Sequence, residues 1–406
     1  MKSVDEQIAE IRRGVEQIVP ETELRRKLER SVAAGKPLRV KFGIDPTSVD
    51  VHLGHTVPLR KLRQFQQLGH QAVLIIGNYT ALVGDPSGRD QTRARLTQEQ
   101  VEINARDYLK QIEKIIDISR TEVRYNGEWF SKMTFLDVMN LTSKITMQQM
   151  LAREDFAKRI EAQTEIRLHE CLYPLMQGYD SVAIHADIEI GGTDQLFNFM
   201  VARDLQQDAG QEPQICITFP ILRGTSGDGK RMGKSLNNYV GVGEPASEQF
   251  GKTMRIPDEQ MREWFTLLTD RTAEEIADFT DPAKTHPMEA KKTLASDIVS
   301  FYYGTEAAQA ARKGFEAQFS LRQDPDEIAE VAIAGAELSD GKVAAAQLLV
   351  LAQLAKSKNE ARRKIGEGAA NIGPDRRKLQ DANEMIPVAT GLVVRLGRQI
   401  RRIKII

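Results

Sequence analysis

Two short apolar segments joined by a helical one place the strongest constraint on how this chain folds. Residues 38–44 and 71–77 are mostly apolar and rich in β-branched side chains, which is typical of buried strands. Between them, residues 55–68 carry leucine and phenylalanine at helical spacing, and Gly69 follows as a helix stop. Such a strand–helix–strand unit predicts a parallel sheet with helical crossovers.

The rest of the first half continues this alternation. Further strands are predicted at residues 182–185, 187–190 and 215–219, with long helical stretches at residues 97–117 and 167–178. We therefore predict an α/β, Rossmann-like parallel-sheet domain over residues 1–224.

After Gly224 the strand signals stop. A glycine-rich loop at residues 224–233 leads into helical segments near residues 257–268, 273–279 and 287–303. The predicted domains that follow are a loop and helical domain over 225–322, an acidic linker over 323–341 and a small α+β module over 342–406.

Charge is distributed unevenly between the two ends of the chain. Residues 342–406 hold 14 Lys and Arg against 5 Asp and Glu, a local charge of +9. Because the whole chain has a net charge of −1, the other 341 residues together carry a charge of −10. A basic terminal module on an acidic body predicts contact with a polyanion.

Composition points to a reducing compartment and excludes several classes of protein. No apolar run approaches the roughly 18 residues of a membrane-spanning helix, and residues 1–10 carry acids without an apolar core, which argues against a secretory signal. Cys171 and Cys216 lie far apart with no ligand spacing, so neither a disulfide framework nor a protein-ligated metal is expected. We interpret the chain as cytoplasmic, with no membrane partner.

The densest group of chemically active residues lies where the first strand ends and the next helix begins. It comprises residues 43–47, Gly-Ile-Asp-Pro-Thr, and the sequence His52-Leu53-Gly54-His55. A helix N-terminus offers free N–H groups to phosphate, imidazoles can donate to phosphate oxygens, and Gly54 leaves room for a purine ring. Taken alone, the group is equally compatible with a turn and helix cap.

A second group, residues 230–235 (Lys-Arg-Met-Gly-Lys-Ser), lies in the glycine-rich loop. A cationic loop can close over a triphosphate and stabilise the charge on departing pyrophosphate. Alone it would more simply be a solvated basic turn, and no Walker A sequence accompanies it.

Together the two groups resemble the His-Ile-Gly-His and Lys-Met-Ser-Lys-Ser signatures of class I aminoacyl-tRNA synthetases, in the expected order. Here they read His52-Leu53-Gly54-His55 and Arg231-Met232-Gly233-Lys234-Ser235, with mild departures at Arg231 and Gly233. Residues 84–89, 173–180 and 191–195 narrow the resemblance to bacterial tyrosyl-tRNA synthetases, from about Ile18 to the C-terminus. This resemblance implies adenylyl transfer from Mg-ATP to L-tyrosine, followed by transfer of tyrosine to the 3′-terminal ribose of tRNA(Tyr).

The resemblance also implies residue roles. Alignment of ATP and stabilisation of pyrophosphate by cations are expected from His52, His55, Arg231 and Lys234, supported by Thr47 and Ser235. The ATP-binding set is expected to comprise Asp45, Gly54, Gly192, Asp194 and Lys234. The tyrosine-binding set is expected to comprise Asp85, Tyr173 and Gln177 at the α-ammonium, Asp180 at the phenolic O–H and Gln195 near the carboxylate.

Helical spacing agrees with the tyrosine set, because Tyr173, Gln177 and Asp180 are at i, i+4 and i+7 and share one helix face. One departure concerns the phenol. Many bacterial relatives have a tyrosine two residues before Gly43, whereas this chain has Lys41, so a second partner for the phenol is left open.

The basic module resembles the S4 RNA-binding domain found at this end of bacterial tyrosyl-tRNA synthetases. A helix capped by Ser357 and a strand over residues 398–404 are predicted. Their basic side chains are candidates for RNA backbone contact: Lys358, Arg362, Arg363, Arg398, Arg401 and Arg402. The family further implies a homodimer.

Two other functions remain as alternatives at this point. One is a related adenylyl-transfer enzyme, such as a tryptophan-specific synthetase or a small-molecule nucleotidyltransferase. The other is an RNA-binding protein that has lost catalysis, against which the intact His52, His55 and Lys234 argue.

Overall fold

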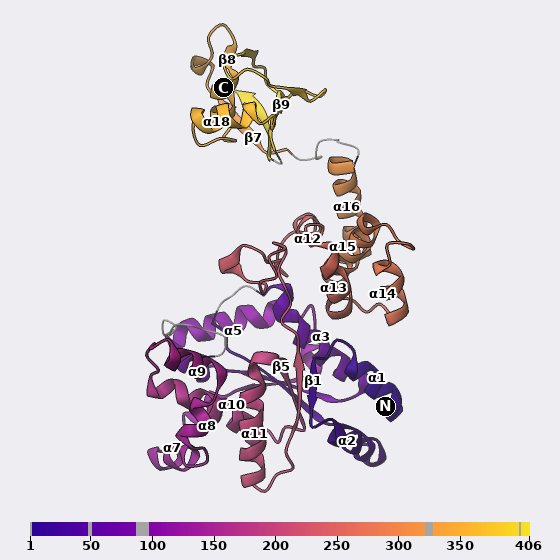
Figure 1. Cartoon of the computed structure of the whole chain (residues 1–406), viewed down its shortest axis with the longest axis vertical. Coiled ribbons are helices and arrows are strands. Elements are labelled where there is room, and N and C mark those ends of the chain that lie inside the picture. Colours follow the sequence, from indigo (N-terminus) through magenta and orange to yellow (C-terminus); the bar gives the residue numbers. More distant parts are fainter. Residues whose placement is uncertain (1, 48–50, 87–96, 321–327, 398) are drawn as a thin grey trace. The chain divides into compact units, whose positions relative to one another are not determined.

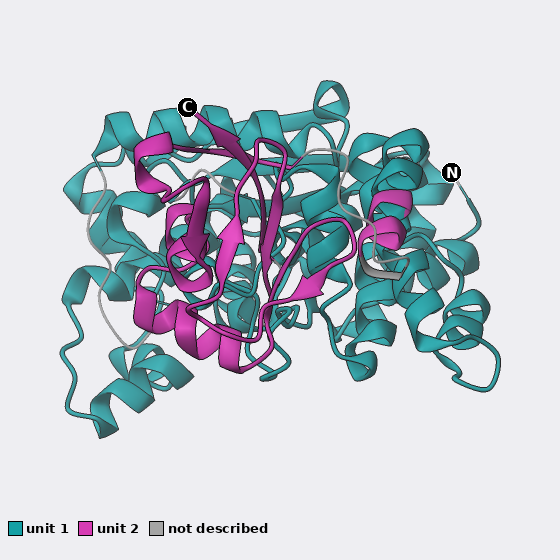
Figure 2. Cartoon of the chain, turned by 90° about the horizontal axis from the view of Figure 1, so that it is seen from above, with its two compact units in different colours: residues 1–312 teal, residues 313–406 magenta. Residues whose placement is uncertain are grey.

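The computed structural model describes residues 2–47, 51–86, 97–320, 328–397 and 399–406 (Figure 1). The chain forms two compact units, residues 1–312 and 313–406 (Figure 2). The boundary predicted at residue 224 therefore lies inside the first unit.

A six-stranded sheet forms the centre of the first unit. Its strands are β1 (Gln17–Val19), β2 (Arg39–Ile44), β3 (Gln71–Ile76), β4 (Thr121–Tyr125), β5 (Ile188–Gly192) and β6 (Ile215–Phe219). They lie in the order β1-β6-β5-β2-β3-β4, and every pairing is parallel except that of β1 with β6. The predicted Rossmann-like parallel sheet is confirmed.

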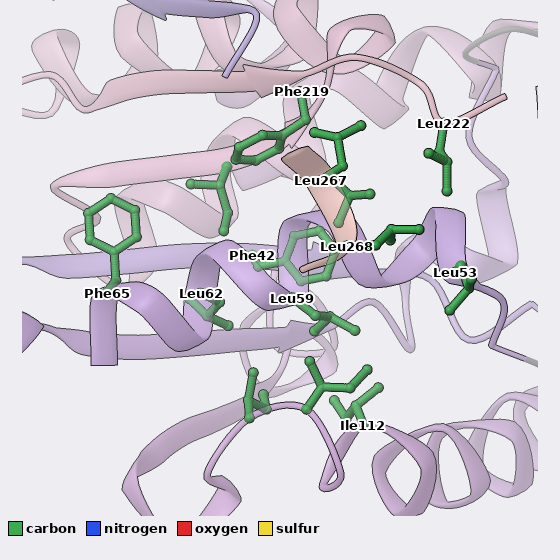
Figure 3. Packing of buried hydrophobic residues seen from close by; sticks show 14 of the residues in the cluster. Phe42, Leu53, Leu59, Leu62, Phe65, Ile112, Phe219, Leu222, Leu267 and Leu268 are labelled. Carbon is green, nitrogen blue, oxygen red and sulfur yellow. The ribbon is translucent and has the colours of Figure 1, made fainter. Parts of the chain in front are cut away.

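Helix α3 (Leu53–Leu68) makes the predicted crossover between β2 and β3. It ends at Gly69, whose φ of 92° is left-handed and suits glycine. Leucine and phenylalanine side chains of α3 pack against Phe42 of β2 and against Leu267 and Leu268 from the helical segment (Figure 3). This packing fixes the start of α3, and with it the His52–His55 motif, against the end of β2.

The other helices before the second unit fall into two groups along the chain. Towards the N-terminus these are α1 (Val4–Arg12), α2 (Glu21–Ala34), α4 (Thr80–Val83), α5 (Gln98–Ile112), α6 (Gly127–Phe130), α7 (Phe135–Thr142), α8 (Met147–Leu151), α9 (Glu154–Glu161), α10 (Tyr173–Ala183) and α11 (Leu196–Asp208). The predicted helical segment contains α12 (Ala246–Thr253), α13 (Met261–Leu268), α14 (Ala273–Thr280) and α15 (Pro287–Tyr303), followed by α16 (Thr305–Phe315). No helix in the described ranges is long and apolar enough to span a membrane.

One predicted strand is wrong. Residues 182–185 are the end of α10 and the turn after it, where His185 has a φ of 51°. Val182 packs as a helical residue beside a cluster with Leu175 and Leu205. A short apolar run looks the same in a buried helix end and in a strand, so the sequence pattern could not distinguish them.

The second unit is a small α+β fold. Its main sheet has the order β10-β9-β12-β13-β7, beside a β11-β8 pair. The elements are β7 (Glu330–Ile333), β8 (Lys342–Ala344), α17 (Ala345–Leu351), α18 (Lys358–Gly366), β9 (Ala370–Ile372), β10 (Arg377–Lys378), β11 (Met385–Pro387), β12 (Val393–Leu396) and β13 (Gln399–Ile405).

Strand β7 falls inside the segment predicted as a linker, residues 323–341. It pairs in parallel with β13, from Glu330 beside Arg402 to Ile333 beside Ile405. Val331 and Ile333 are buried while Glu330 and Ala332 are exposed, an alternation too short to stand out in an acidic stretch. The sheet of the basic module therefore begins before residue 342.

Candidate active site

A cavity of about 510 Å³ opens where β2, β3, β5 and β6 end. Residues that follow each of these strands line it, which is the crevice where open α/β sheets bind ligands. Most of the predicted site residues lie on its wall: Asp45, Thr47, His52, Gly54, His55, Asp85, Tyr173, Gln177, Asp180, Gly192, Asp194, Gln195, Arg231 and Ser235.

Backbone pairing brings the second motif to the first. The N–H of Leu53 donates to the carbonyl of Val240 at 2.9 Å, and the N–H of Val242 donates to that of Val51 at 2.8 Å. The chain that leaves the cationic loop is thereby held beside the start of α3, although nearly 190 residues separate the two segments.

Asn238 fixes the cationic loop itself and was missed by sequence reasoning. Its side chain is fully buried, accepts from the N–H of Gly233 at 2.8 Å and donates to the carbonyl of Arg231 at 3.1 Å. A Cβ on Gly224 would lie 2.2 Å from this amide, so glycine is required there. Nothing in the local pattern around Asn238 indicates these partners.

Lys234 is the one predicted phosphate-site residue that does not line the described cavity wall. Its ammonium lies 5.8 Å from the centre of the Tyr239 ring, within cation–π range. The ring of His52 lies 6.3 Å from the same tyrosine. Lys234 and His52 therefore both lie near the Tyr239 ring.

His52 and His55 lie side by side at the start of α3, and burial favours the neutral form of His52, which can donate to a phosphate oxygen. Their rings stack with centres 3.7 Å apart. Burial lowers the pKa of His52 to about 3, with a further contribution from the neighbouring His55. Nδ1 of His55 accepts from the N–H of His52 at 3.4 Å, so its proton is on Nε2, where it can be donated to a phosphate oxygen.

Two close contacts explain glycines of the site. A Cβ on Gly54 would meet the His52 ring at 3.1 Å, and one on Gly192 would meet the carboxylate of Asp194 at 2.4 Å. Burial raises the pKa of Asp194, and the charge of Asp85 adds to this effect.

The predicted helix face on α10 is present. The hydroxyl of Tyr173 donates to Asp45 at 3.0 Å, and the hydroxyl of Thr80 donates to the other oxygen of Asp45 at 2.7 Å. Asp45, assigned to ATP by resemblance, is therefore in direct contact with a residue of the predicted tyrosine set.

Asp180 lies fully buried at the inner part of this face. It accepts from Nε1 of Trp129 at 3.0 Å and from Nδ2 of Asn126 at 3.3 Å. Burial raises its pKa to about 7, partly offset by the nearby Lys41. Trp129 and Asn126 follow β4 and carry no sequence signal that links them to α10.

A hydrogen-bonded chain joins the remaining tyrosine-set residues. Nε2 of Gln195 donates to Asp85 at 2.9 Å, while Nδ2 of Asn198 donates to Gln177 at 2.7 Å and to Gln195 at 3.1 Å. Asn198 was not predicted, although its position three residues after Gln195 could have indicated a shared helix face.

Lys41 does not take part in lining the described cavity wall. Val40 and Phe42 are in the core cluster with α3, so alternation along β2 turns Lys41 to the α10 face of the sheet. There its ammonium pairs with Glu189 of β5 at 2.9 Å, and its side chain is 0% exposed.

The predicted RNA-binding residues lie on two elements of the second unit. Lys358, Arg362 and Arg363 are exposed on α18, which Ser357 caps by accepting from the N–H of Glu360. Arg401 and Arg402 are half-buried on β13.

Some predicted features fall elsewhere. Arg398 and residues 87–89 of the predicted 84–89 motif lie outside the described residues. Among the described residues, no three His, Cys, Asp or Glu side chains are grouped so as to hold a metal ion.

Comparison with known proteins places this geometry in a family. Residues 33–320 match the family described as tRNA synthetases class I (W and Y). The chain is 49% identical to a tyrosine–tRNA ligase of Symbiobacterium thermophilum, over 98% of this chain and 97% of that protein. It is 47% identical to a tyrosine–tRNA ligase of Carboxydothermus hydrogenoformans, with the same coverage.

A solved structure agrees at the level of fold. The tyrosyl-tRNA synthetase of Archaeoglobus fulgidus, determined with L-tyrosine, superposes with a TM-score of 0.60 at 23% identity and covers 76% of this chain and 100% of its own. The chain belongs to the class I tRNA synthetases of the tryptophan and tyrosine group, and within them to the tyrosyl-tRNA synthetases.

Proposed function

We propose that this chain is a tyrosine–tRNA ligase that forms tyrosyl-adenylate from L-tyrosine and ATP, releases pyrophosphate, and transfers tyrosine to the 3′-terminal ribose of tRNA(Tyr). One observation carries the proposal. A single cavity is lined by residues of both motifs, His52, His55, Arg231 and Ser235 among them, and by the buried Asp180.

Adenylyl transfer in this cavity needs alignment and charge stabilisation rather than a base. The carboxylate of tyrosine is already ionised when it attacks the α-phosphorus of ATP, so no proton has to be removed. His52 and His55 donate from their ring N–H groups, while Arg231 and Lys234 supply positive charge as pyrophosphate leaves. Thr47 and Ser235 support the phosphates, and Mg²⁺ enters bound to the substrate ATP.

The remaining ATP contacts follow from the glycines. Gly54 lets the backbone pass close to the His52 ring on the cavity wall, where the nucleotide is proposed to bind, and Gly192 with Asp194 borders the ribose. Asp45 orients the hydroxyl of Tyr173 at the junction of the ATP and tyrosine regions.

Recognition of tyrosine rests on the α10 face and its partners. Asp85, Tyr173 and Gln177 surround the α-ammonium, and Gln195 lies near the carboxylate. Asp180 accepts the phenolic O–H at a site where phenylalanine would leave a buried carboxylate without that partner.

Pyrophosphate exchange into ATP, measured with one amino acid at a time, tests this function. The expected result is exchange with tyrosine and little with phenylalanine or tryptophan. Exchange driven by tryptophan would favour a tryptophan-specific enzyme, and no exchange with any amino acid would favour an RNA-binding protein without catalysis.

The second unit is proposed to bind tRNA(Tyr). A chain truncated after Ser320, before β7, should keep tyrosine-dependent pyrophosphate exchange but lose about tenfold or more in tRNA charging, because phosphate contacts dominate RNA affinity. Both activities are measured on the same preparation. Equal loss of both would show that the unit supports the fold of the first unit instead.

An exposed apolar surface supports the homodimer that the family implies. Phe135 is 80% exposed and Leu168 is 76% exposed, and exposed apolar side chains that occur together are typical of protein–protein contact surfaces. Six exposed apolar side chains lie within residues 135–168, and we call this group the 135–168 patch: Phe135, Leu136, Met139, Met147, Ile160 and Leu168. Its proposed occupant is the same patch on a second copy of this chain.

Phe135→Asp should convert the dimer to a monomer, since it places a charge in an apolar contact. Sedimentation velocity measures the change, with Met288→Asp as a control at a half-exposed methionine on α15. A wild-type chain that sediments as a monomer at micromolar concentration would refute the homodimer. We also propose a cytoplasmic location, where charged tRNA is used.

A further inference from the structure

A buried ion pair lies beneath the tyrosine-binding face without touching the cavity. Lys41 on β2 and Glu189 on β5 are register partners on adjacent parallel strands, and their side chains are 0% and 1% exposed. Burying two charges is costly, and a buried pair adds little net stability compared with apolar residues.

All three donors of the Lys41 ammonium are used. They bind Glu189 at 2.9 Å, the backbone carbonyl of Gln177 at 2.8 Å and the hydroxyl of Ser181 at 2.8 Å. Gln177 and Ser181 are one turn apart on α10, and Asp180 lies between them in sequence. Lys41 thus anchors one turn of α10 to the sheet, and that turn carries Asp180.

The Glu189 carboxylate fixes the side chain of Gln177. It accepts from Nε2 of Gln177 at 3.2 Å, and also from Ser181 at 3.1 Å and Gln214 at 2.5 Å. With its amide nitrogen held by Glu189, Gln177 presents its oxygen towards Asn198 at 2.7 Å. An amide oxygen is the atom that can accept from a substrate ammonium.

The bonds continue from this pair to the cavity without a break. Asn198 binds both Gln177 and Gln195, and Gln195 binds Asp85 at 2.9 Å. The pair is therefore linked to the residues proposed for both polar ends of the substrate amino acid.

We propose that Lys41 and Glu189 form a positioning pair that sets substrate specificity: Glu189 orients the amide of Gln177, and Lys41 holds the turn of α10 that aims Asp180 at the tyrosine phenol. This inference rests on the proposed function. The pair also gives Lys41 a role at the phenol end of the site, because Lys41 holds α10 in place and does not serve as a second direct partner of the tyrosine phenol.

The charges of the pair act on Asp180 in opposite directions. Lys41 favours the ionised carboxylate and Glu189 disfavours it. The other titratable group facing Asp180 is Tyr173, beyond which lie Asp45 and Asp85, while Asn126 and Trp129 contribute neutral donors. Since the phenolic O–H is donated to the ionised form, the KM for tyrosine should rise as the pH falls through the pKa of Asp180.

Steady-state pyrophosphate exchange of Lys41→Met and Glu189→Gln in the full chain tests the pair. Each variant should raise the KM for tyrosine about tenfold or more while leaving the KM for ATP within about twofold. The rise in tyrosine KM should set in at higher pH in Lys41→Met than in Glu189→Gln, with the wild type between them. Coincident pH profiles, or equal changes in both KM values, would overturn the inference.

Lys27→Met is the matched control. Lys27 is a lysine of α2 that is 1% exposed and pairs with Asp187 at 3.9 Å, but it contacts none of the α10 residues named above. Its loss should leave both KM values and the pH profile unchanged.

A milder variant covers the case in which Lys41→Met does not fold. Ser181→Ala removes one hydrogen bond to Lys41 and one to Glu189 without removing a charge, and should raise the KM for tyrosine severalfold. Lys41→Arg, which keeps the positive charge, should have a KM for tyrosine nearer to that of the wild type. No change in Ser181→Ala and Glu189→Gln would refute the inference, whereas a wild type without tyrosine-dependent exchange would refute the proposed function itself.

Discussion

Lys234→Ala should lower the rate of tyrosyl-adenylate formation about 10²- to 10³-fold, while tyrosine binds with a dissociation constant within about twofold of wild type. In the free protein its ammonium is held near the Tyr239 ring at 5.8 Å, beside rather than in the cavity wall. The positive charge of Lys234 is needed only when negative charge develops on the departing pyrophosphate. Removing Lys234 should therefore weaken transition-state stabilisation and leave ground-state binding of tyrosine unchanged.

Pre-steady-state quench of adenylate formation, together with equilibrium binding of tyrosine, separates these two quantities. Lys230→Ala provides a control within the same loop, since Lys230 is exposed and pairs with Asp228 at 3.6 Å. A Lys234→Ala enzyme that forms adenylate at the normal rate but binds tyrosine weakly would contradict the role assigned to this residue.

Asp180→Asn should lower kcat/KM for tyrosine about 10- to 100-fold and reduce discrimination against phenylalanine by a similar factor. A hydrogen bond to a charged group contributes about 1.5–3 kcal/mol, and asparagine has the same shape without the charge. The kcat/KM for phenylalanine should rise relative to that for tyrosine. In the wild type, bound phenylalanine leaves the buried charge of Asp180 without a phenol partner, and asparagine carries no such charge.

The measurement is kcat/KM for both amino acids in pyrophosphate exchange. Asp208→Asn, which removes a carboxylate from a surface pair with Lys144 at 2.6 Å, is the control. An unchanged ratio of tyrosine to phenylalanine in Asp180→Asn would show that Asp180 does not bind the phenol.

The parts of the fold that follow from local pattern were predictable. The strand–helix–strand unit around α3 and the long helix α15 are both where hydrophobic periodicity places them. The structures of residues 182–185 and of strand β7 were not predictable in this way. Runs of about four residues are too short for hydrophobic periodicity to distinguish helix, strand and loop.

The site divides in a similar way. Residues such as His52, Gly54 and Tyr173 stand in recognisable local motifs, and they line one cavity. Asn126, Asn198 and Asn238 act through partners brought together only by the fold, so their roles could not be predicted from the sequence around them.

Charge states were also beyond the sequence. The low pKa of His52 and the raised pKa of Asp180 arise from burial, which local composition does not show. The partner of Lys41 depends on the register of β2 against β5, since one residue of slip would turn the lysine to the other face of the sheet.

Two segments far apart in the chain are proposed to act on one triphosphate, in the same cavity as a carboxylate that selects tyrosine. A crystal structure with tyrosine and a non-hydrolysable ATP analogue tests it most directly. We expect phosphate oxygens within hydrogen-bonding distance of both His55 Nε2 and the Lys234 ammonium, with the phenol on Asp180. A triphosphate bound away from either residue, or a tyrosine ring pointing away from α10, would contradict it.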